Sequence, residues 1–165
     1  MKKILLLMLG CVALVSCGPS KGKLSELAKE NLKLSLDNPK QLKVISVSQP
    51  DSAFGTGYFS QTEVKGMIKT MQLVTDTIMK RTDGMRQFNP DDAYVLSLAD
   101  RQMKAMSEIR SLVGKAGRKG EFCGWKVRID YSCIDANGNP YHAERWCFID
   151  KDGRQVYKTF DLPLP

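Results

Sequence analysis

The sequence contains few of the residues from which common catalytic sites are built. It has one histidine, His142, so a serine triad or a cluster of histidine metal ligands has little to draw on. It also lacks a glycine-rich phosphate loop, a Gly-x-Ser-x-Gly nucleophile motif and a His-Glu-x-x-His zinc motif. We therefore expect neither a metal site nor a bound cofactor.

Long apolar runs are also missing beyond the first sixteen residues. Residues 4–16 form a run of thirteen residues without a charge, whereas a membrane-spanning helix needs about 20 apolar residues. The run follows Lys2 and Lys3, and its length and flanking charge are typical of an export signal. We interpret residues 1–16 as a signal peptide. An ordinary secretory signal or an uncleaved anchor is the alternative.

The end of this run carries a motif for lipid attachment. Leu14-Val15-Ser16-Cys17, followed by Gly18, resembles the lipobox of bacterial lipoproteins, with a small residue at the cleavage site and a cysteine that takes the lipid. One acyl chain anchors a protein weakly, so the three chains usual for such lipoproteins would hold it firmly. We expect cleavage before Cys17, lipidation of Cys17, a flexible tether over residues 17–23 and a single domain over residues 24–165.

The charge of the mature chain does not favour nucleic acid. Removal of residues 1–16 leaves 149 residues with 23 basic and 18 acidic side chains, a net charge of +5. The densest basic stretch, residues 115–120, is glycine-rich and has none of the interleaved aromatic residues of a single-strand binding surface. We interpret it as a solvated loop and expect no nucleic-acid partner.

Helical spacing of apolar residues predicts three helices. The first spans residues 24–36, with Ser25 as its cap and Asp37-Asn38-Pro39 at its end. A helical hairpin then covers residues 60–114. Its first helix opens on the capping-box residues Ser60 and Glu63, and its second opens at residues 89–92, with Asn89 as the cap. The apolar stripes expected to face the core are Val64, Met67, Ile68, Met71, Val74 and Ile78, then Leu96, Ala99, Met103, Met106 and Val113. A stripe rich in methionine is more often core than an adaptable partner-binding groove, the alternative reading.

Strands are predicted at residues 42–48 and in the last third of the chain. Residues 123–133 alternate strictly, with Cys, Trp, Val, Ile, Tyr and Cys at odd positions and polar residues or glycine at even ones. Asn137-Gly138 predicts a two-residue hairpin turn, which would place Val127 opposite Phe148 and Cys133 opposite His142. A second turn at Asp152-Gly153 leads into residues 156–160. The Leu162-Pro163-Leu164-Pro165 tail is expected to be extended but not part of a central strand.

These elements predict an α+β fold. We expect an antiparallel meander sheet of three to four strands, with the N-terminal helix and the helical hairpin packed on one face. The other face would be open to solvent and would display Lys126, Arg128 and Asp130.

Three cysteines remain in the predicted domain. Cys123 and Cys133 lie about 33 Å apart along one strand, too far for a disulfide. A disulfide between Cys133 and Cys147 requires a longer hairpin loop than we predict, so we expect three reduced thiols. The predicted register places Cys133 beside His142, which is the minimum for a nucleophilic thiol. A packed cysteine beside a half-exposed histidine in a turn is the simpler reading.

Several motifs resemble a group of small lipoproteins of Bacteroides-type Gram-negative bacteria. They are Leu36-Asp37-Asn38-Pro39 at the end of the first helix, Asp51-Ser52, Gly124-Trp125-Lys126-Val127, Phe148-Ile149-Asp150 and the Asp152-Gly153 turn. The resemblance covers most of the mature chain and implies no catalytic residues. Surface-exposed lipoproteins of such bacteria tend to have acidic residues after the cysteine, whereas residues 18–23 are basic here. That difference implies the outer membrane, facing the periplasm.

The sequence therefore favours a membrane-anchored lipoprotein that acts as a non-enzymatic binding module with an envelope protein as partner. Its contact surface would be the open sheet face or the helical hairpin. Two alternatives remain: a thiol-dependent enzyme built on Cys133 and His142, and an envelope transport accessory that holds an apolar ligand between hairpin and sheet.

Overall fold

The computed structural model describes residues 18–55, 58–115, 117 and 120–165. The predicted signal peptide and the predicted lipid attachment site, Cys17, lie outside the described residues, as do parts of the basic stretch at 115–120. None of the helices in the described part of the chain is long and apolar enough to cross a membrane.

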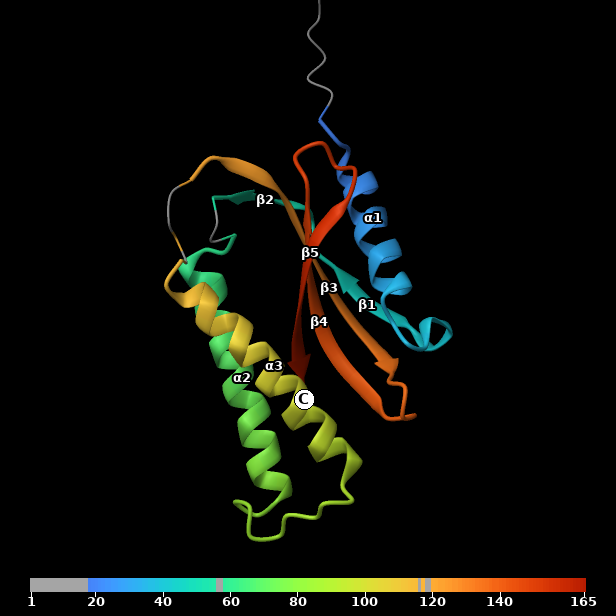
Figure 1. Cartoon of the computed structure of the whole chain (residues 1–165), viewed down its shortest axis with the longest axis vertical. Helices are drawn as coiled ribbons and strands as arrows, with labels where there is room; N and C mark the ends of the chain where they lie inside the picture. The colour runs from blue at the N-terminus through green and yellow to red at the C-terminus, as the bar shows by residue number, and fades with distance from the viewer. Residues whose placement is uncertain (1–17, 56–57, 116, 118–119) are drawn as a thin grey trace, which may run out of the picture.

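The structure confirms the α+β class and contains three helices and a five-stranded antiparallel sheet (Figure 1). The elements are α1 (Lys21–Leu34), a short 3-10 helix η1 (Pro39–Gln41), β1 (Lys43–Val47), β2 (Asp51–Phe54), α2 (Gln61–Arg81), α3 (Ala93–Val113), β3 (Phe122–Ile134), β4 (Pro140–Ile149) and β5 (Val156–Leu164).

The sheet is a β3-β4-β5 meander with two short strands along the outer edge of β3. β1 pairs with the second half of β3, and β2 pairs with its first half. The sequence prediction ended the strand at residue 48 and missed β2, which begins directly after Gln49 and Pro50. These two residues interrupt the edge only locally, and the chain continues beside β3. Pro163 lies in β5, an edge strand that pairs with β4 alone, which is a place where proline is tolerated.

Helices cover both faces of the sheet, so the prediction of one covered and one open face is wrong. Figure 1 shows α1 on one side of the sheet and the α2–α3 hairpin on the other. Under α1 the odd positions of β3 form a buried cluster with residues of β4, and Val127, Ile129 and Tyr131 are at most 1% exposed. The helix contributes Leu24, Ala28 and Leu32, which repeat at four-residue intervals.

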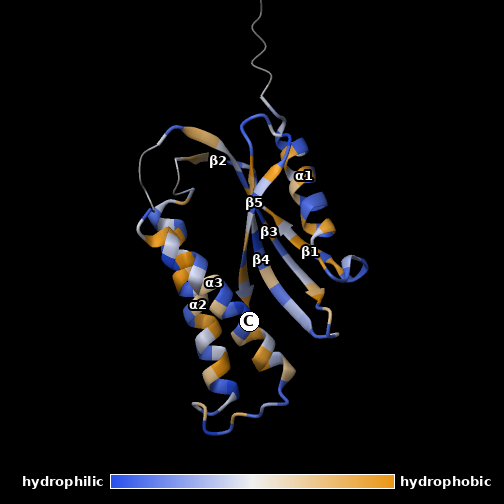
Figure 2. Ribbon diagram, viewed as in Figure 1, coloured by the Kyte–Doolittle hydropathy of each residue, from blue (hydrophilic) through white to orange (hydrophobic). Residues whose placement is uncertain are grey.

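The α2–α3 hairpin packs on the opposite face, mainly over β4 and β5. Figure 2 shows hydrophobic and hydrophilic residues alternating along both helices, as expected for helices with one buried side. The ring of Phe59 packs edge-on against Trp146 and Phe148, with ring centres 5.0 and 5.4 Å apart. The rest of this core is Val64, Met67, Met71, Val74, Leu98, Ala105, Ile109, Leu112, Phe160 and Leu162.

The β3–β4 register differs from the prediction by one residue. Val127 faces Cys147 rather than Phe148, and Tyr131 faces Ala143. The loop is longer than two residues: Gly138 N–H donates to Asp135 O at 3.1 Å, Asp135 N–H donates to Asn139 O at 2.9 Å, and Gly138 has a positive φ of 85°. This is a turn followed by a left-handed glycine. Because strand side chains alternate, the one-residue difference places Trp146 and Phe148 on the hairpin side of the sheet.

Two helix starts also differ from the prediction. α1 begins at Lys21 and is capped by Ser20, so the last three residues of the predicted tether are helical, and Ser25 is not the cap. α3 is capped by Asp92 rather than Asn89, and the Asp92 side chain accepts from Val95 N–H at 3.1 Å. The α2 capping box of Ser60 and Glu63 is confirmed.

The stripe predicted for α3 is wrong at Leu96, Met103 and Val113, which are exposed, whereas Met106 packs against the core as predicted. The stripe predicted for α2 is largely confirmed. The buried side of α3 is formed by a second stripe, Val95, Leu98, Ala105, Ile109 and Leu112.

Candidate functional site

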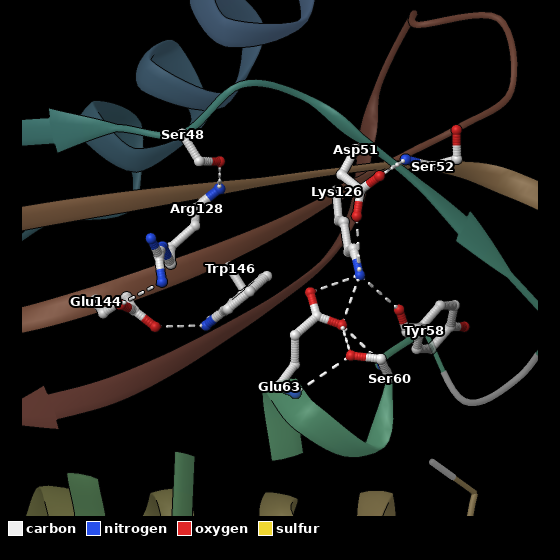
Figure 3. A network of polar contacts seen from close by, with 10 residues as sticks. All are labelled: Ser48, Asp51, Ser52, Tyr58, Ser60, Glu63, Lys126, Arg128, Glu144 and Trp146. Atoms are coloured by element: carbon white, nitrogen blue, oxygen red, sulfur yellow. Dashed lines mark hydrogen bonds and ion pairs between the residues drawn. The ribbon is translucent and has the colours of Figure 1, made fainter. Parts of the chain in front are cut away.

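A polar groove lies where the hairpin leaves the sheet uncovered, beside β3 and the β1–β2 edge (Figure 3). It has a volume of about 450 Å³. Residues from four parts of the fold line it: Ser48, Gln49 and Asp51 from the β1–β2 edge, Thr62, Glu63, Gly66, Met67 and Thr70 from α2, Lys126 and Arg128 from β3, and Glu144 and Trp146 from β4. We call this the polar groove.

Lys126 is the most buried charged residue of the groove. It is 5% exposed, although the sequence predicted it on an open face. Its Nζ lies 2.7 and 2.8 Å from the two carboxylate oxygens of Glu63 and donates to Tyr58 O at 3.3 Å. Asp51 adds a second carboxylate at 3.4 Å. A buried ammonium requires such partners, since an unpaired charge is costly to remove from water.

Glu63 holds the start of α2 and Lys126 at the same time. Its Oε2 accepts from Ser60 N–H at 2.7 Å and from Ser60 Oγ at 2.9 Å, while Ser60 Oγ accepts from Glu63 N–H. The capping box is therefore bonded to the central strand of the sheet. This contact fixes the first turn of α2 over β3 and sets the position of one wall of the groove (Figure 3).

A second charged group, formed by Arg128, Glu144 and Trp146, lies further along the groove. Trp146 Nε1 donates to one oxygen of Glu144 at 2.8 Å, and Arg128 Nη1 lies 3.5 Å from the other. The Glu144 side chain is 16% exposed, whereas that of Arg128 is 49% exposed. Burial raises the pKa of Glu144, and the nearby Arg128 guanidinium opposes the rise.

The opposite wall of the groove is the side of α2 that carries small side chains. Thr62, Gly66 and Thr70 follow one another at four-residue spacing, so they share one side of the helix. A Cβ added to Gly66 would meet no atom within 4 Å, so this wall is not packed against the sheet. The small side chains leave room between α2 and Arg128.

Both carboxylates of the groove floor have partners. Glu63 is bonded to Lys126, and Glu144 is bonded to Trp146 and paired with Arg128. A raised pKa in a groove, as for Glu144, is also a feature of catalytic acids. The half-exposed Arg128 guanidinium and the 68% exposed Asp51 side chain are the groups most open to a partner.

The structure does not bring the predicted pair Cys133 and His142 into contact. Cys133 faces Tyr141 and His142 faces Ser132, so the two side chains lie on opposite faces of the sheet. Both line a groove of about 420 Å³ at the end of the sheet. However, Cys133 is only 3% exposed and its thiol donates to Asn38 O at 3.3 Å. His142 Nε2 lies 2.5 Å from Asp130 Oδ1 instead.

The three cysteines of the described residues are free, as predicted. Cys133 and Cys147 share the α1 side of the sheet, but Cys147 lies opposite Val127, about 20 Å along β3 from Cys133. The Cys147 thiol is fully buried beneath Ala28 of α1, and burial raises its pKa to about 12. A thiol with this pKa is almost wholly protonated at neutral pH and is a poor nucleophile.

The described residues contain no group of three or more His, Cys, Asp or Glu side chains placed to hold a metal ion. Comparison of the chain with protein-family models, curated proteins and solved structures gives no match.

The polar groove was not predicted as a site, because its partners are far apart in the sequence. Lys126 and Glu63 are separated by 63 residues. Each was assigned a local role, Lys126 in a solvent-facing position of a strand and Glu63 in a capping box. The one available signal was that both faces of β4, with Trp146 and Phe148 on one and Cys147 and Ile149 on the other, are apolar. That pattern indicates a sheet covered on both sides.

Proposed function

We propose that this protein is a lipid-anchored lipoprotein of the bacterial outer membrane that faces the periplasm and binds an envelope protein without catalysing a reaction. The anchor is lipid on Cys17, supported by the Leu14-Val15-Ser16-Cys17 motif at the end of a short apolar run. The resemblance to small Bacteroides-type lipoproteins, which have no assigned catalytic residues, is part of the same proposal.

The polar groove is the proposed binding surface of the domain. The observation that supports it most is the arrangement of its charges. Lys126, Glu63 and Glu144 are paired along the floor, while the Arg128 and Asp51 side chains stay about half exposed or more at the rim. Groups held in this way are pre-organised for hydrogen bonds and ion pairs, and less entropy is lost when a partner binds.

A charge reversal tests the groove. Crosslinking in intact cells, followed by purification of the lipoprotein, should capture a partner with the wild type and lose it with Arg128→Glu. Arg110→Glu is the matched control, because Arg110 is an exposed arginine near the end of α3, outside the groove. Equal capture by both variants would show that the groove is not the binding surface.

The anchor and the membrane face have separate tests. Palmitate labelling should be present in the wild type and absent in Cys17→Ala. Protease added to intact cells should leave the domain uncut, because a domain that faces the periplasm is shielded. Cleavage in intact cells would place the domain on the cell surface instead.

The structure favours this function over the two alternatives. A thiol enzyme needs an accessible thiol, and the Cys133 thiol is buried and bonded to the backbone. A thiol reagent should modify Cys123, the one partly exposed cysteine of the described residues, and leave Cys133 unmodified until the protein unfolds. Where the hairpin packs on the sheet, side chains around Phe59, Trp146 and Phe148 form a closed core with no room for an apolar ligand. The space that remains between α2 and the sheet is the polar groove, which charged residues line.

A further inference from the structure

The start of the described chain is packed onto one end of the domain. A Cβ placed on Gly153, in the turn between β4 and β5, would lie 2.4 Å from Pro19 Cβ, so Pro19 rests directly on this turn. Ser20 then caps α1 at Lys21. Only Gly18 separates Cys17 from the packed residues, and consecutive Cα atoms are 3.8 Å apart. Lipid on Cys17 would therefore hold this end of the domain at the bilayer surface.

The same end carries basic side chains. Lys21 and Lys23 are exposed in the first turn of α1, and Lys151 and Arg154 are exposed in the β4–β5 turn. Figure 1 shows the start of α1 and this turn side by side, at the opposite end of the molecule from the α2–α3 connection. Asp152 in the turn lies 3.9 Å from Arg154. Asp150, at the start of the turn, is a second carboxylate, and its Oδ1 accepts from Arg154 N–H at 2.6 Å. Four cations against these two anions leave the turn and the first turn of α1 with a surplus of positive charge.

Aromatic rings continue this surface from the β4–β5 turn. Trp125 Nε1 donates to Lys151 O at 3.2 Å, which ties its ring to the turn. Phe122 packs edge-on against Trp125 with ring centres 5.3 Å apart, and Phe54 follows at 6.0 Å from Phe122. Phe54 is 50% exposed. Glu121, next to Phe122, is the exposed acidic residue of this part.

Basic and aromatic side chains together are the composition of a surface that contacts lipid headgroups. Tryptophan favours the interface because its ring is apolar and its N–H is polar. Lysine and arginine extend their charged ends to anionic headgroups. We propose that Lys21, Lys23, Phe122, Trp125, Lys151 and Arg154 form a face that lies against a bilayer with anionic headgroups, and we call it the anchor face. This inference rests on the proposed lipid anchor at Cys17.

The two tryptophans of the chain allow a direct test. Purified wild-type lipoprotein is reconstituted into vesicles of phosphatidylglycerol and phosphatidylcholine, with or without bromine on the acyl chains, and tryptophan emission is measured. Trp146→Phe leaves Trp125 as the reporter, and we expect roughly twofold quenching by the brominated lipid, since interfacial tryptophans lie near the acyl chains. Trp125→Phe leaves Trp146, which is 7% exposed beneath the hairpin, and its emission should not change.

Charge reversal tests the basic part of the face. Lys151→Glu with Arg154→Glu should reduce the quenching of Trp125 in anionic vesicles and have little effect in phosphatidylcholine alone. The matched control is Lys80→Glu with Arg86→Glu, which changes the same charge near the α2–α3 connection, at the far end. Circular dichroism of each variant confirms that it is folded before its fluorescence is compared.

Two further measurements separate this inference from the anchor. Intact mass shows whether Cys17 carries lipid, and flotation shows whether the protein is on the vesicles. Lipidated protein that floats with unquenched Trp125 would overturn the anchor face and leave the anchor intact. Protein without lipid would overturn the anchor. The unlipidated protein can still be added to anionic vesicles, where it tests the anchor face without the anchor. Absence of Trp125 quenching in that experiment would overturn the anchor face. If Lys151 becomes shielded from solvent only when envelope proteins are present, the anchor face contacts a protein partner. That result would also overturn the proposal of a bilayer contact.

Discussion

The two faces of the sheet are covered in different ways. α1 lies along β3 and β4 and buries a compact apolar cluster, in which Val127, Ile129 and Cys147 are fully buried. The hairpin lies over β4 and β5 and reaches β3 only through the first turn of α2. There, Lys126, Arg128 and Glu144 stand where apolar residues would be expected, and the polar groove forms between them and α2.

The difference shows how a sheet with helices on both faces can keep an open polar groove. One face is closed by a single helix with a four-residue repeat of apolar side chains. The other is closed only in part, and an ion pair rather than apolar contact joins α2 to the central strand. In the proposed function, the α1 face contributes mainly to stability, whereas the face under the α2–α3 hairpin contributes to stability at one end and to binding at the other.

The largest expected effect on stability comes from removing an aromatic ring from the hairpin face, the face of the sheet that the α2–α3 hairpin covers. Phe148 is fully buried between Tyr58 and Phe59, and Phe148→Ala should lower the free energy of unfolding by about 3–5 kcal/mol. Ile129→Ala, in the α1 face, should cost about 2–5 kcal/mol. Urea unfolding measures both variants. Trp125 reports on the α1 face and Trp146 on the hairpin face, so one shared transition would show that the two faces unfold together. Separate transitions would contradict this expectation.

A smaller loss is expected from breaking the ion pair that joins α2 to β3. Glu63→Gln leaves the Lys126 ammonium, whose side chain is 6% exposed, with Asp51 as its remaining carboxylate. Breaking a buried pair costs about 3–5 kcal/mol, and we expect about 2 here because Glu63 is a quarter exposed and Asp51 remains. Urea unfolding again provides the measurement.

Two further variants make this result specific. Adding Lys126→Met to Glu63→Gln should restore part of the stability, because it removes the unpaired charge. Glu108→Gln breaks a surface pair with Lys158 and should change stability by less than about 0.5 kcal/mol. A loss in Glu63→Gln no larger than that in Glu108→Gln would show that the buried pair does not hold α2 to the sheet.

Local patterns of the sequence predicted most of the elements. The capping box of Ser60 and Glu63 and the α2 stripe depend on residues within one or two helical turns, and both agree with the structure. The alternation of β3 also describes its α1 side correctly, because Val127, Ile129 and Tyr131 are buried there. In α3 two apolar stripes overlap, one through Leu96 and Met103 and one through Leu98 and Ile109. Spacing alone could not choose between them.

The arrangement of the elements was harder to predict, because it depends on contacts between distant residues. Asn137-Gly138 fits a two-residue turn and also the longer turn that the structure has. The prediction took the two-residue turn, which places the apolar Phe148 opposite Val127 on one buried face. Because both faces of β4 are buried, an apolar side chain no longer indicates which face of the sheet its residue lies on. The same error left the hairpin face open in the prediction and hid the polar groove.

The pH dependence of Glu144 gives a smaller effect that is specific to the groove. Burial raises its folded-state pKa above the unfolded value of about 4.3, so its protonated form stabilises the fold. That contribution is fully present below the unfolded pKa and is lost as the pH rises through the folded pKa. Glu144→Gln imitates the protonated form. It should raise stability at pH 7 by roughly 1 kcal/mol or less, and the gain should disappear as the pH falls below about 4.

Urea midpoints of the wild type and Glu144→Gln from pH 3 to pH 7 provide this measurement. Glu108→Gln serves as the control, since the Glu108 side chain is about half exposed and pairs with Lys158 at 3.5 Å outside the groove. A difference between wild type and Glu144→Gln that is constant across this range, or that favours the wild type at pH 7, would contradict the burial of a carboxyl with a raised pKa.

The smallest expected effect concerns the turn between β3 and β4. Deleting Ala136 leaves Asn137-Gly138 as a two-residue loop between Asp135 and Asn139, which is the turn that this dipeptide prefers. With Asp135 opposite Asn139, Tyr131 should still face Ala143, as in the wild type. The buried side chains on both faces of the sheet favour the same pairing. Stability should change by less than about 1 kcal/mol, since shortening a loop by one residue alters its closure entropy little. Cross-strand NMR contacts between Tyr131 and Ala143 would show this directly. Contacts from Tyr131 to Glu144 instead would show that the loop keeps three residues and shifts the register by one, so that the buried side chains on the two faces do not fix the pairing.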